Sequence, residues 1–168
     1  MTHAPHFTDH PHLEVRNIPG KGRGVFATKD IEPGTALAVF CGPIIICDDA
    51  LALPPSAVNH AIQCGPKSFV WSLGYLAECF NHSCSPNCGI RNLTEIFAVD
   101  RILAGTECVW DYRLSENSTW ELKNCICGSL DCAGTVRNYN SLPMHKKEEY
   151  LFRGMVSEWI IWEFSSTK

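Results

Sequence analysis

The sequence predicts a mainly β domain with a few short helices, and three observations support this fold class. The chain has 168 residues, enough for one hydrophobic core and too few for two ordinary domains. Hydrophobic residues make up 45% and charged residues 19%, a composition typical of globular proteins. From Leu13 onward, short alternating apolar runs are separated by turns rich in proline and glycine, the pattern of short antiparallel strands.

The expected elements follow one another in short pieces. The first part of the chain predicts strands at Leu13–Val15, Gly24–Ala27, Ala36–Phe40 and Ile44–Ile46. Residues 48–66 predict a loop or short helix followed by a strand, residues 95–112 a strand, turn and strand, and residues 115–124 a loop. Residues 141–154 predict a helix with Ser141 as its cap and Gly154 as its stop, and the aromatic residues 155–164 fit either a helix or a strand.

Composition also narrows the function. A net charge of −4 argues against a domain held on nucleic acid by bulk charge and favours a basic peptide or an amine as partner. The first ten residues show no secretory signal, and no apolar run approaches the ~20 residues of a membrane span. We therefore expect a cytoplasmic or nuclear protein that is not secreted and does not bind membranes. In such a compartment ten cysteines stay reduced, which favours metal ligands or catalysis over disulfides.

Three cysteines lie close together near residue 130. Cys125, Cys127 and Cys132 fall within eight residues, and three thiolates leave a tetrahedral zinc ion one ligand short. Cys84 and Cys88 are the obvious donors of a fourth sulfur. The alternative is a set of thiols without metal, because the C-x-C spacing departs from the commoner C-x-x-C.

Two further stretches and one tyrosine are candidates for chemistry. The turn "GKGRG" at Gly20–Gly24 would let a ligand approach the backbone, although a plain hairpin turn is the default and the spacing is not that of a dinucleotide site. In "FNHSCSPNC" a nucleophilic dyad of His82 and Ser83 is disfavoured, because no G-x-S-x-G context surrounds it. Tyr112 ends a predicted strand, where a lone tyrosine is usually structural.

Four motifs in one order carry a resemblance to a known family. "GKGRGVFATKDIEPGT", "FNHSCSPN", "AGTECVWDY" and "CICGSLDCAG" together resemble the SET-domain family of protein-lysine methyltransferases, including its cysteine-rich post-SET segment. The likeness runs from about Leu13 to Gly134, and the layout is similar to short stand-alone members without a pre-SET region. It implies small curved β-sheets of the β-clip type, in which the motif around Asn81 and the C-terminal strand form a pseudoknot.

The resemblance also divides the chain. Residues 1–12 would be a flexible leader, residues 13–114 the SET domain, residues 115–138 the post-SET zinc segment, and residues 139–168 a helical and aromatic extension.

The resemblance further implies a cofactor site, a catalytic site and a metal site. The residues that would bind S-adenosylmethionine are Lys21, Gly22, Arg23, Asn81, His82, Tyr112, Thr135 and Val136, the last two closing over it. Tyr112 would be the catalytic tyrosine, with Trp110 and Phe40 beside it in the catalytic site. Cys84 would complete a structural zinc site with Cys125, Cys127 and Cys132.

The implied reaction is an in-line displacement in which a lysine amine takes a methyl group from a sulfonium. The amine must be neutral, and with a reference pKa of about 10.4 its neutralisation near pH 7 costs roughly 4–5 kcal/mol. Desolvation and the sulfonium charge both lower that pKa, so no dedicated general base is required. Tyr112 would orient the amine. The partner would be a protein or peptide with an exposed lysine.

Three departures from the family pattern keep other substrates open. Tyr75 and Glu78 stand where the family often has asparagine and arginine. Trp110 stands where it usually has phenylalanine or tyrosine, which would restrict transfer to one methyl group or reshape the pocket. Residues Phe40 to Pro43 stand in place of the family's "YxGE" element and lack its tyrosine hydroxyl and its glutamate carboxyl group. A small-molecule enzyme on the same scaffold, and a non-catalytic module that binds cofactor and zinc, are the alternatives.

Overall fold

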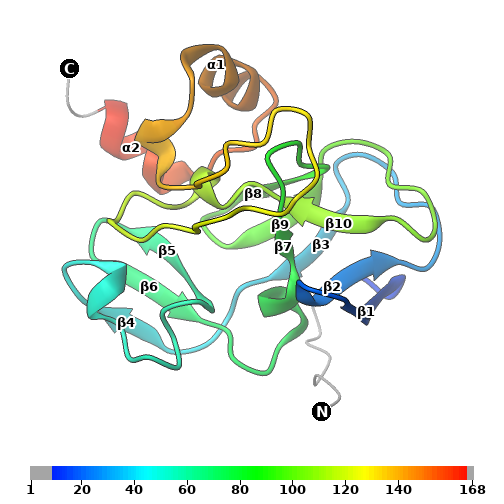
Figure 1. The fold of residues 1–168 in the computed structure, drawn as a ribbon, viewed down its shortest axis with the longest axis horizontal. Helices are drawn as coiled ribbons and strands as arrows, with labels where there is room; N and C mark the ends of the chain where they lie inside the picture. Colours follow the sequence, from blue (N-terminus) through cyan, green and yellow to red (C-terminus); the bar gives the residue numbers. More distant parts are fainter. Residues whose placement is uncertain (1–8, 166–168) are drawn as a thin grey trace.

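The computed structural model describes residues 9–165, and within them the fold is mainly β, as predicted (Figure 1). Residues 1–8 of the expected leader and residues 166–168 of the expected extension lie outside the described residues. Residues 9–12 contact the domain, since the His10 amide donates to the carbonyl of Leu37 at 2.7 Å. The bounds of the four segments expected above remain predictions.

Two curved sheets make up the domain. The larger has the order β1-β2-β10-β8-β9-β3, with β7 also paired to β10, and the smaller has the order β4-β6-β5. The strands of the larger sheet are β1 (Leu13–Ile18), β2 (Gly22–Ala27), β3 (Ala36–Val39), β7 (Asn81–His82), β8 (Cys88–Arg91), β9 (Glu95–Ala98) and β10 (Glu107–Trp110). Those of the smaller sheet are β4 (Ile44–Ile46), β5 (Ala61–Gly65) and β6 (Ser68–Trp71).

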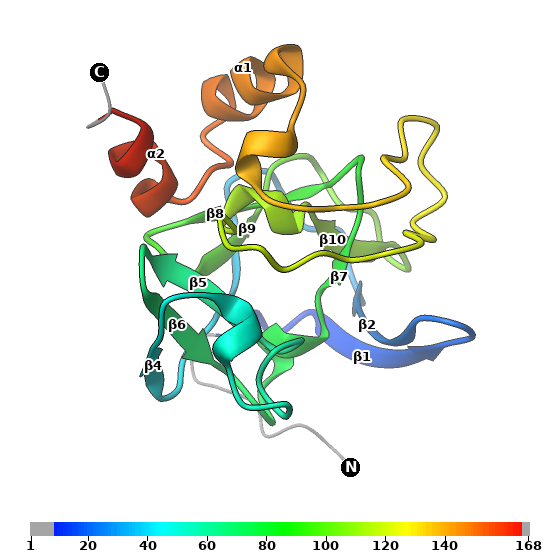
Figure 2. The same cartoon turned by 60° about the vertical axis from the view of Figure 1, so that its left-hand side comes forward.

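Parallel pairing of β10 places the future site. Val109 pairs with Asn81 and Trp110 with His82, whereas most other strands pair antiparallel. Residues nearly thirty positions apart in sequence therefore lie side by side, as the predicted pseudoknot requires. Figure 2 shows the chain that follows β10 crossing over this region before it reaches the helices.

Short helices connect and cover the sheets. The 3-10 helices are η1 (Ala50–Ala52), η2 (Leu76–Cys79), η3 (Tyr112–Leu114) and η4 (Tyr139–Ser141), and the α-helices are α1 (Met144–Phe152) and α2 (Glu158–Ser165). The aromatic segment is thus helical. Ser141 does not cap α1: its hydroxyl donates to the carbonyl of Asn138, and Pro143 occupies the cap position. Gly154 follows α1 with φ +63°, the left-handed conformation that ends a helix.

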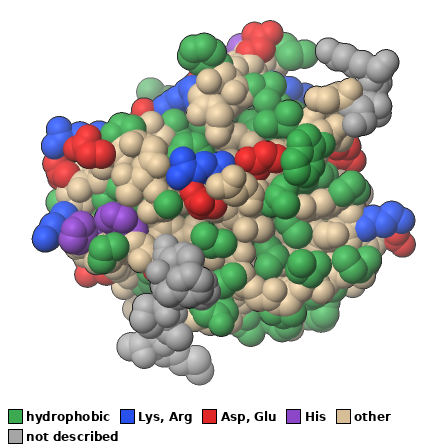
Figure 3. Space-filling view, turned by 180° about the vertical axis from the view of Figure 1, so that it is seen from behind, with side chains coloured by type: hydrophobic (Ala, Val, Ile, Leu, Met, Phe, Trp, Pro, Cys, Tyr) green, Lys and Arg blue, Asp and Glu red, His purple; other side chains and the backbone are tan. Residues whose placement is uncertain are grey.

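The core lies between the larger sheet and the C-terminal helices. Tyr150 from α1, Trp159 and Ile160 from α2 and Met155 between them are buried with the sheet residues. The aromatic extension therefore packs on the domain through one face. On the side seen in Figure 3, acidic and basic side chains lie in small mixed groups, without a dominant basic patch. None of the helices in residues 9–165 is both long and apolar enough to span a membrane.

Candidate functional site

Two cavities meet at Tyr112. A narrow one of about 50 Å³ is lined by Phe40, Trp110 and Tyr112, with residues 58–62 from the segment that leads into β5. A wider one of about 450 Å³ is lined by Gly20 and Lys21 of the Gly-rich turn, the β7 residues, Tyr112, Leu122 and residues 124–127. A ligand in one cavity can therefore reach a ligand in the other only past Tyr112 and its immediate neighbours.

The hydroxyl of Tyr112 is held in place. It donates to the carbonyl of Phe80 at 3.0 Å, and the ring packs against those of His82, Trp110 and Trp120 at centroid distances of 5.3, 5.3 and 6.2 Å. Burial raises the pKa of this phenol well above its usual value, so the side chain is neutral across the physiological range. Its oxygen keeps lone pairs to accept a hydrogen bond from a ligand.

Trp110 and Phe40 narrow the smaller cavity. Both line it, their rings lie 5.9 Å apart, and Trp110 is only 2% exposed. The indole Nε1 is buried and has no hydrogen-bond partner among the described residues. The cavity therefore has an apolar wall with one unused donor.

The Gly-rich turn contributes unequally to the wider cavity. Gly20 and Lys21 line it, and the Lys21 ammonium lies 3.6 Å from a Glu107 carboxylate oxygen. Gly22 has φ +85°, a conformation that side-chain-bearing residues rarely adopt. Arg23 reaches the other way, and its guanidinium donates to the Glu78 carboxylate at 3.0 Å. Of the predicted cofactor residues in this turn, Lys21 therefore lines the wider cavity, whereas Gly22 and Arg23 do not, and Arg23 contacts the narrow cavity only through Glu78.

Asn81 and His82 both line the wider cavity but are anchored by different partners. The Asn81 amide nitrogen donates to the Arg23 carbonyl and to Glu107, both at 2.8 Å, which leaves its oxygen as an acceptor. His82 accepts from the Tyr112 amide at Nδ1, so the ring proton lies on Nε2, 3.2 Å from the Cys84 sulfur. Burial lowers the pKa of His82 to about 4, so this ring is neutral.

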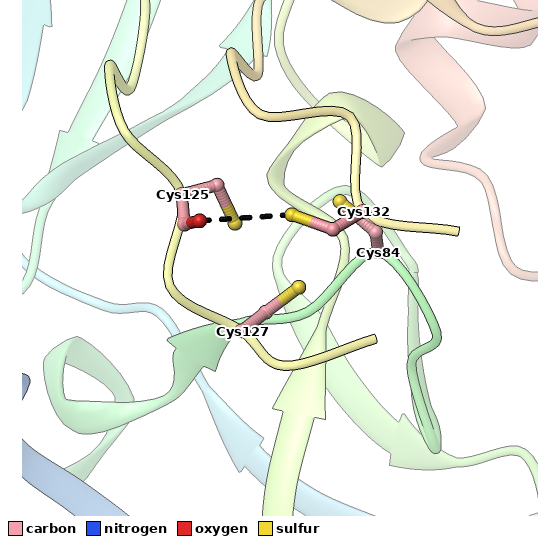
Figure 4. Close-up of side chains that lie close together, drawn as sticks. All are labelled: Cys84, Cys125, Cys127 and Cys132. Carbon is pink, nitrogen blue, oxygen red and sulfur yellow. Dashed lines mark hydrogen bonds between the residues drawn. The ribbon is translucent and has the colours of Figure 1, made fainter. Parts of the chain in front are cut away.

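Four cysteine sulfurs converge beside this histidine (Figure 4). The sulfurs of Cys84, Cys125, Cys127 and Cys132 all lie within 4.8 Å of one another. A zinc ion with four thiolates at about 2.3 Å would place its ligands roughly 3.8 Å apart, so the set fits with small adjustments. Cys88 points elsewhere and donates to the Asn87 side chain, which favours Cys84 over Cys88 as the fourth ligand.

Within the cluster one thiol, that of Cys127, is favoured as a thiolate, whereas burial raises the pKa of the Cys84 and Cys125 thiols. Burial opposes ionisation of Cys127, but hydrogen bonds from backbone groups of Cys84 and Ser129 and from the neighbouring thiols lower its pKa to about 7. The Ala133 amide points at the Cys84 sulfur at 3.4 Å. Donors aimed at sulfur, with four thiols at one point, form a closed ligand set typical of structural zinc.

Several lining residues escaped sequence reasoning. Trp120 and Asn59 line both cavities, and the Trp120 indole donates to the Asn59 amide oxygen at 3.3 Å. No sequence motif marks either residue, since each lies in a segment expected to be loop. Residues 122–127 wall the wider cavity, whereas Thr135 and Val136 are not among its lining residues; Val136 is fully buried and pairs with Leu122.

Glu78 is placed differently from its expected family counterpart. Its side chain is 1% exposed and lines the narrow cavity, where it pairs with Arg23 and lies 3.8 Å from His60. A carboxylate thus stands where the family often has an arginine, and it forms an ion pair with Arg23 from β2. Tyr75 precedes η2 and does not line either cavity described above.

Comparison with known proteins gives a consistent set of relatives. A histone-lysine N-methyltransferase from Arabidopsis thaliana (ASHH1) is 29% identical over 133 residues, covering 68% of this chain and 26% of the relative. An H3 lysine-36 specific histone-lysine N-methyltransferase from Yarrowia lipolytica is 29% identical, covering 73% and 18%. Human SETD2, also named a histone-lysine N-methyltransferase, is 25% identical, covering 78% and 6%. The chain thus spans about a quarter or less of the length of these curated relatives.

Solved structures and family models agree on the fold. KRYPTONITE in complex with mCHG DNA and SAH is similar with a TM-score of 0.58 at 23% identity, covering 74% of this chain and 28% of KRYPTONITE. The family model described as SET domain matches residues 22–113, more than half of the chain. This chain therefore belongs to the SET-domain family.

Proposed function

We propose that this chain is an S-adenosylmethionine-dependent protein-lysine N-methyltransferase. The observation that carries the proposal is the position of Tyr112 where the wide and narrow cavities meet. The relatives support it, since those described above are named histone-lysine N-methyltransferases. A similar structure, that of KRYPTONITE, is a complex with mCHH DNA, an H3(1-15) peptide and SAH, the product that S-adenosylmethionine leaves after transfer.

The wider cavity would hold the cofactor, whose sulfonium supplies the methyl group. Gly20 and Lys21 lie at one edge, and the oxygen of Asn81 would accept from the cofactor's amine. Residues 122–127, tied to His82 through Cys84, would cover it on the other side. In this proposal Thr135 and Val136 act indirectly, by anchoring that covering segment through the pairing of Val136 with Leu122.

The narrow cavity would hold the substrate lysine. A four-carbon side chain with a terminal amine suits a small, largely apolar space, whereas a metabolite of ordinary size would need more than about 50 Å³. Tyr112 would accept a hydrogen bond from the amine and aim its lone pair at the methyl carbon. Positioning of this kind can contribute several kcal/mol to the rate. The small-molecule alternative is thereby less favoured.

Trp110 would limit the number of methyl groups. Its indole fills the side of the narrow cavity and contacts both Phe40 and Tyr112. A second methyl group on the amine would need additional volume beside that ring, and interiors of this density do not provide it without displacement. We therefore propose mono-methylation, with a protein lysine such as that of a histone as substrate and a nuclear location as the consequence. Direct nucleic acid binding is not expected, given the net charge of −4.

Zinc would be structural in this enzyme. The four cysteines would use all positions of a tetrahedral ion, which leaves no open site for substrate. Its role would be to join residues 122–132 to the chain just after β7, which carries Cys84.

The test is transfer of a labelled methyl group from S-adenosylmethionine to core histones and to a lysine-rich peptide panel. We expect labelled lysine with the wild type and at least a hundredfold less with Tyr112→Phe, which loses the oriented oxygen. Tyr139→Phe is the matched control, a buried tyrosine that packs against Phe164 outside both cavities. Measurable cofactor binding without any labelled protein would refute the proposal and favour a non-catalytic binding module.

A further inference from the structure

A histidine and a glutamate lie together in the wall of the narrow cavity. The Nδ1 atom of His60 is 3.8 Å from one carboxylate oxygen of Glu78, and the other oxygen accepts a hydrogen bond from Arg23 at 3.0 Å. The Glu78 side chain is 1% exposed, whereas that of His60 is 40% exposed. An arginine thus fixes a buried carboxylate, and the carboxylate faces an imidazole that reaches solvent.

These groups share their cavity with Tyr112 and Trp110. An amine substrate arrives mainly as an ammonium ion at neutral pH, since its reference pKa is about 10.4. Desolvation and the sulfonium charge lower the amine's pKa, so a dedicated base is not required, but the amine must still lose one proton before its nitrogen can act as a nucleophile. Tyr112 cannot take this proton readily, because it is already neutral and its hydroxyl proton is engaged with Phe80. The Trp110 indole offers only a donor.

A histidine beside a carboxylate is a common arrangement for accepting a proton, and here the two groups lie at ion-pair distance, 3.8 Å apart. The negative charge of Glu78 stabilises the imidazolium that forms, and the exposed side of His60 provides a route to water. No motif in the sequence connects His60 with Glu78, which are eighteen positions apart.

We propose that His60, positioned by Glu78, accepts the proton that the substrate ammonium loses before methyl transfer. This inference rests on the proposed function. The nitrogen keeps its electron pair when the N–H bond breaks, and the proton forms a new bond with the imidazole. The neutral amine then attacks the methyl carbon, the carbon–sulfur bond electrons remain on sulfur, and an N-methylammonium and a neutral thioether result. The imidazolium returns its proton to solvent.

Other charged groups face the same space. Arg23 contacts His60 only through Glu78, and Tyr112 is neutral. Glu116 also lines the cavity, but its carboxylate accepts the Ser118 amide at 2.7 Å. Burial raises the pKa of Glu116, so this group competes for the same proton. A test must therefore separate His60 from Glu116.

The pH dependence of kcat/KM for methyl transfer provides that separation. With His60→Gln we expect a loss on the order of 10²-fold at pH 7, the usual contribution of a general base. The loss should shrink as pH rises toward the amine's own pKa, and added imidazole should restore part of the rate. His145→Gln, the same change at an exposed position on α1, should leave both rate and profile unchanged.

A second readout does not depend on activity. In protein without cofactor or substrate, Glu78→Gln should change the NMR chemical shifts of the His60 ring, because the charged carboxylate that faces the imidazole at 3.8 Å is replaced by a neutral amide. Glu78→Gln keeps an oxygen for Arg23, so it also serves if His60→Gln does not fold.

Each outcome decides the inference. A wild-type pH profile in His60→Gln overturns it while the proposed function stands, and so does a profile that changes only in Glu116→Gln. Unchanged chemical shifts of the His60 ring in Glu78→Gln remove the positioning role of Glu78. Absence of transfer by the wild type to any amine refutes the proposed function itself, and the proton step with it.

Discussion

Replacing Cys127 with serine should remove the metal and release the segment that walls the wider cavity. Cys127 supplies one of four sulfurs that lie within 4.8 Å of one another, and serine is a poor zinc ligand. The segment 123–132 also contains Cys125 and Cys132, and it includes no helix or strand. Outside the metal site, few interactions hold it in place.

The magnitude follows from the segment's own contacts. Ordering the ten residues 123–132 costs about 1–2 kcal/mol each, or about 10–20 kcal/mol in total. The backbone bonds in and around it are two between Leu122 and Val136, at 2.8 and 2.9 Å, one from Cys125 to Gly134 at 2.7 Å, and one from Cys132 to Ser129 at 3.2 Å. Together they offset about 4 kcal/mol. A structural zinc site contributes about 10–16 kcal/mol of binding free energy, which is enough to offset the remaining cost of ordering the segment. Without zinc the segment should be disordered while the sheets remain folded.

Three measurements check this reasoning. Cys127→Ser should lose about one equivalent of zinc, hydrogen exchange should become fast over residues 122–134, and cofactor affinity should fall at least tenfold. Exchange in β8 and β10 should stay slow, because their side chains belong to the core. Cys47→Ser, a half-buried thiol outside the cluster, is the control. Retained protection of the segment in metal-free protein would show that zinc does not order it.

Three further predictions concern the pocket and the fold. Trp110→Phe should let product analysis by mass spectrometry detect dimethyl-lysine, because a smaller ring leaves room for a second methyl group; unchanged mono-methylation would contradict the steric role. Glu158→Gln should lower the free energy of unfolding in urea by about 1–2 kcal/mol, since its carboxylate accepts the amides of the positive-φ residues at positions 92 and 93, and the exposed Glu148→Gln should not. Gly89→Ala should lower the free energy of unfolding by about 1–3 kcal/mol through overpacking, because a Cβ there would lie 2.9 Å from the Met155 Cα. An unchanged thermal midpoint would show that α1 and α2 can shift to make room.

The strands and the family could be predicted because their signals are local. The strand at Ile44–Ile46 and the turns that follow Ile18 and Ile31 depend on alternation and on glycine or proline at fixed places, which neighbouring residues decide. The order of four motifs then predicted the SET fold, which the family match over residues 22–113 confirms. The prediction that Ser141 caps the helix was wrong, because its hydroxyl donates to the Asn138 carbonyl and Pro143 occupies the cap position. The roles of the individual site residues stay predictions.

The sequence by itself determined the class of fold, the family and the residue types available for cofactor, metal and catalysis. The spacing alone does not favour Cys84 over Cys88, so only the family resemblance placed Cys84 with the cysteine cluster. These properties depend on local patterns and on motifs, and both can be recognised without knowing any distance between residues.

Only the tertiary structure decided which groups share a cavity. His60, Glu78 and Arg23 come from a loop, a 3-10 helix and a strand, and no periodicity relates them. The same holds for Trp120, which reaches Tyr112 from a segment without regular structure. Parallel pairing of β10 with β7 brings these parts together, because it places the motif around Asn81 beside the strand that leads into Tyr112. Contacts between distant segments arise from chain topology, and a single sequence does not encode topology in any local pattern.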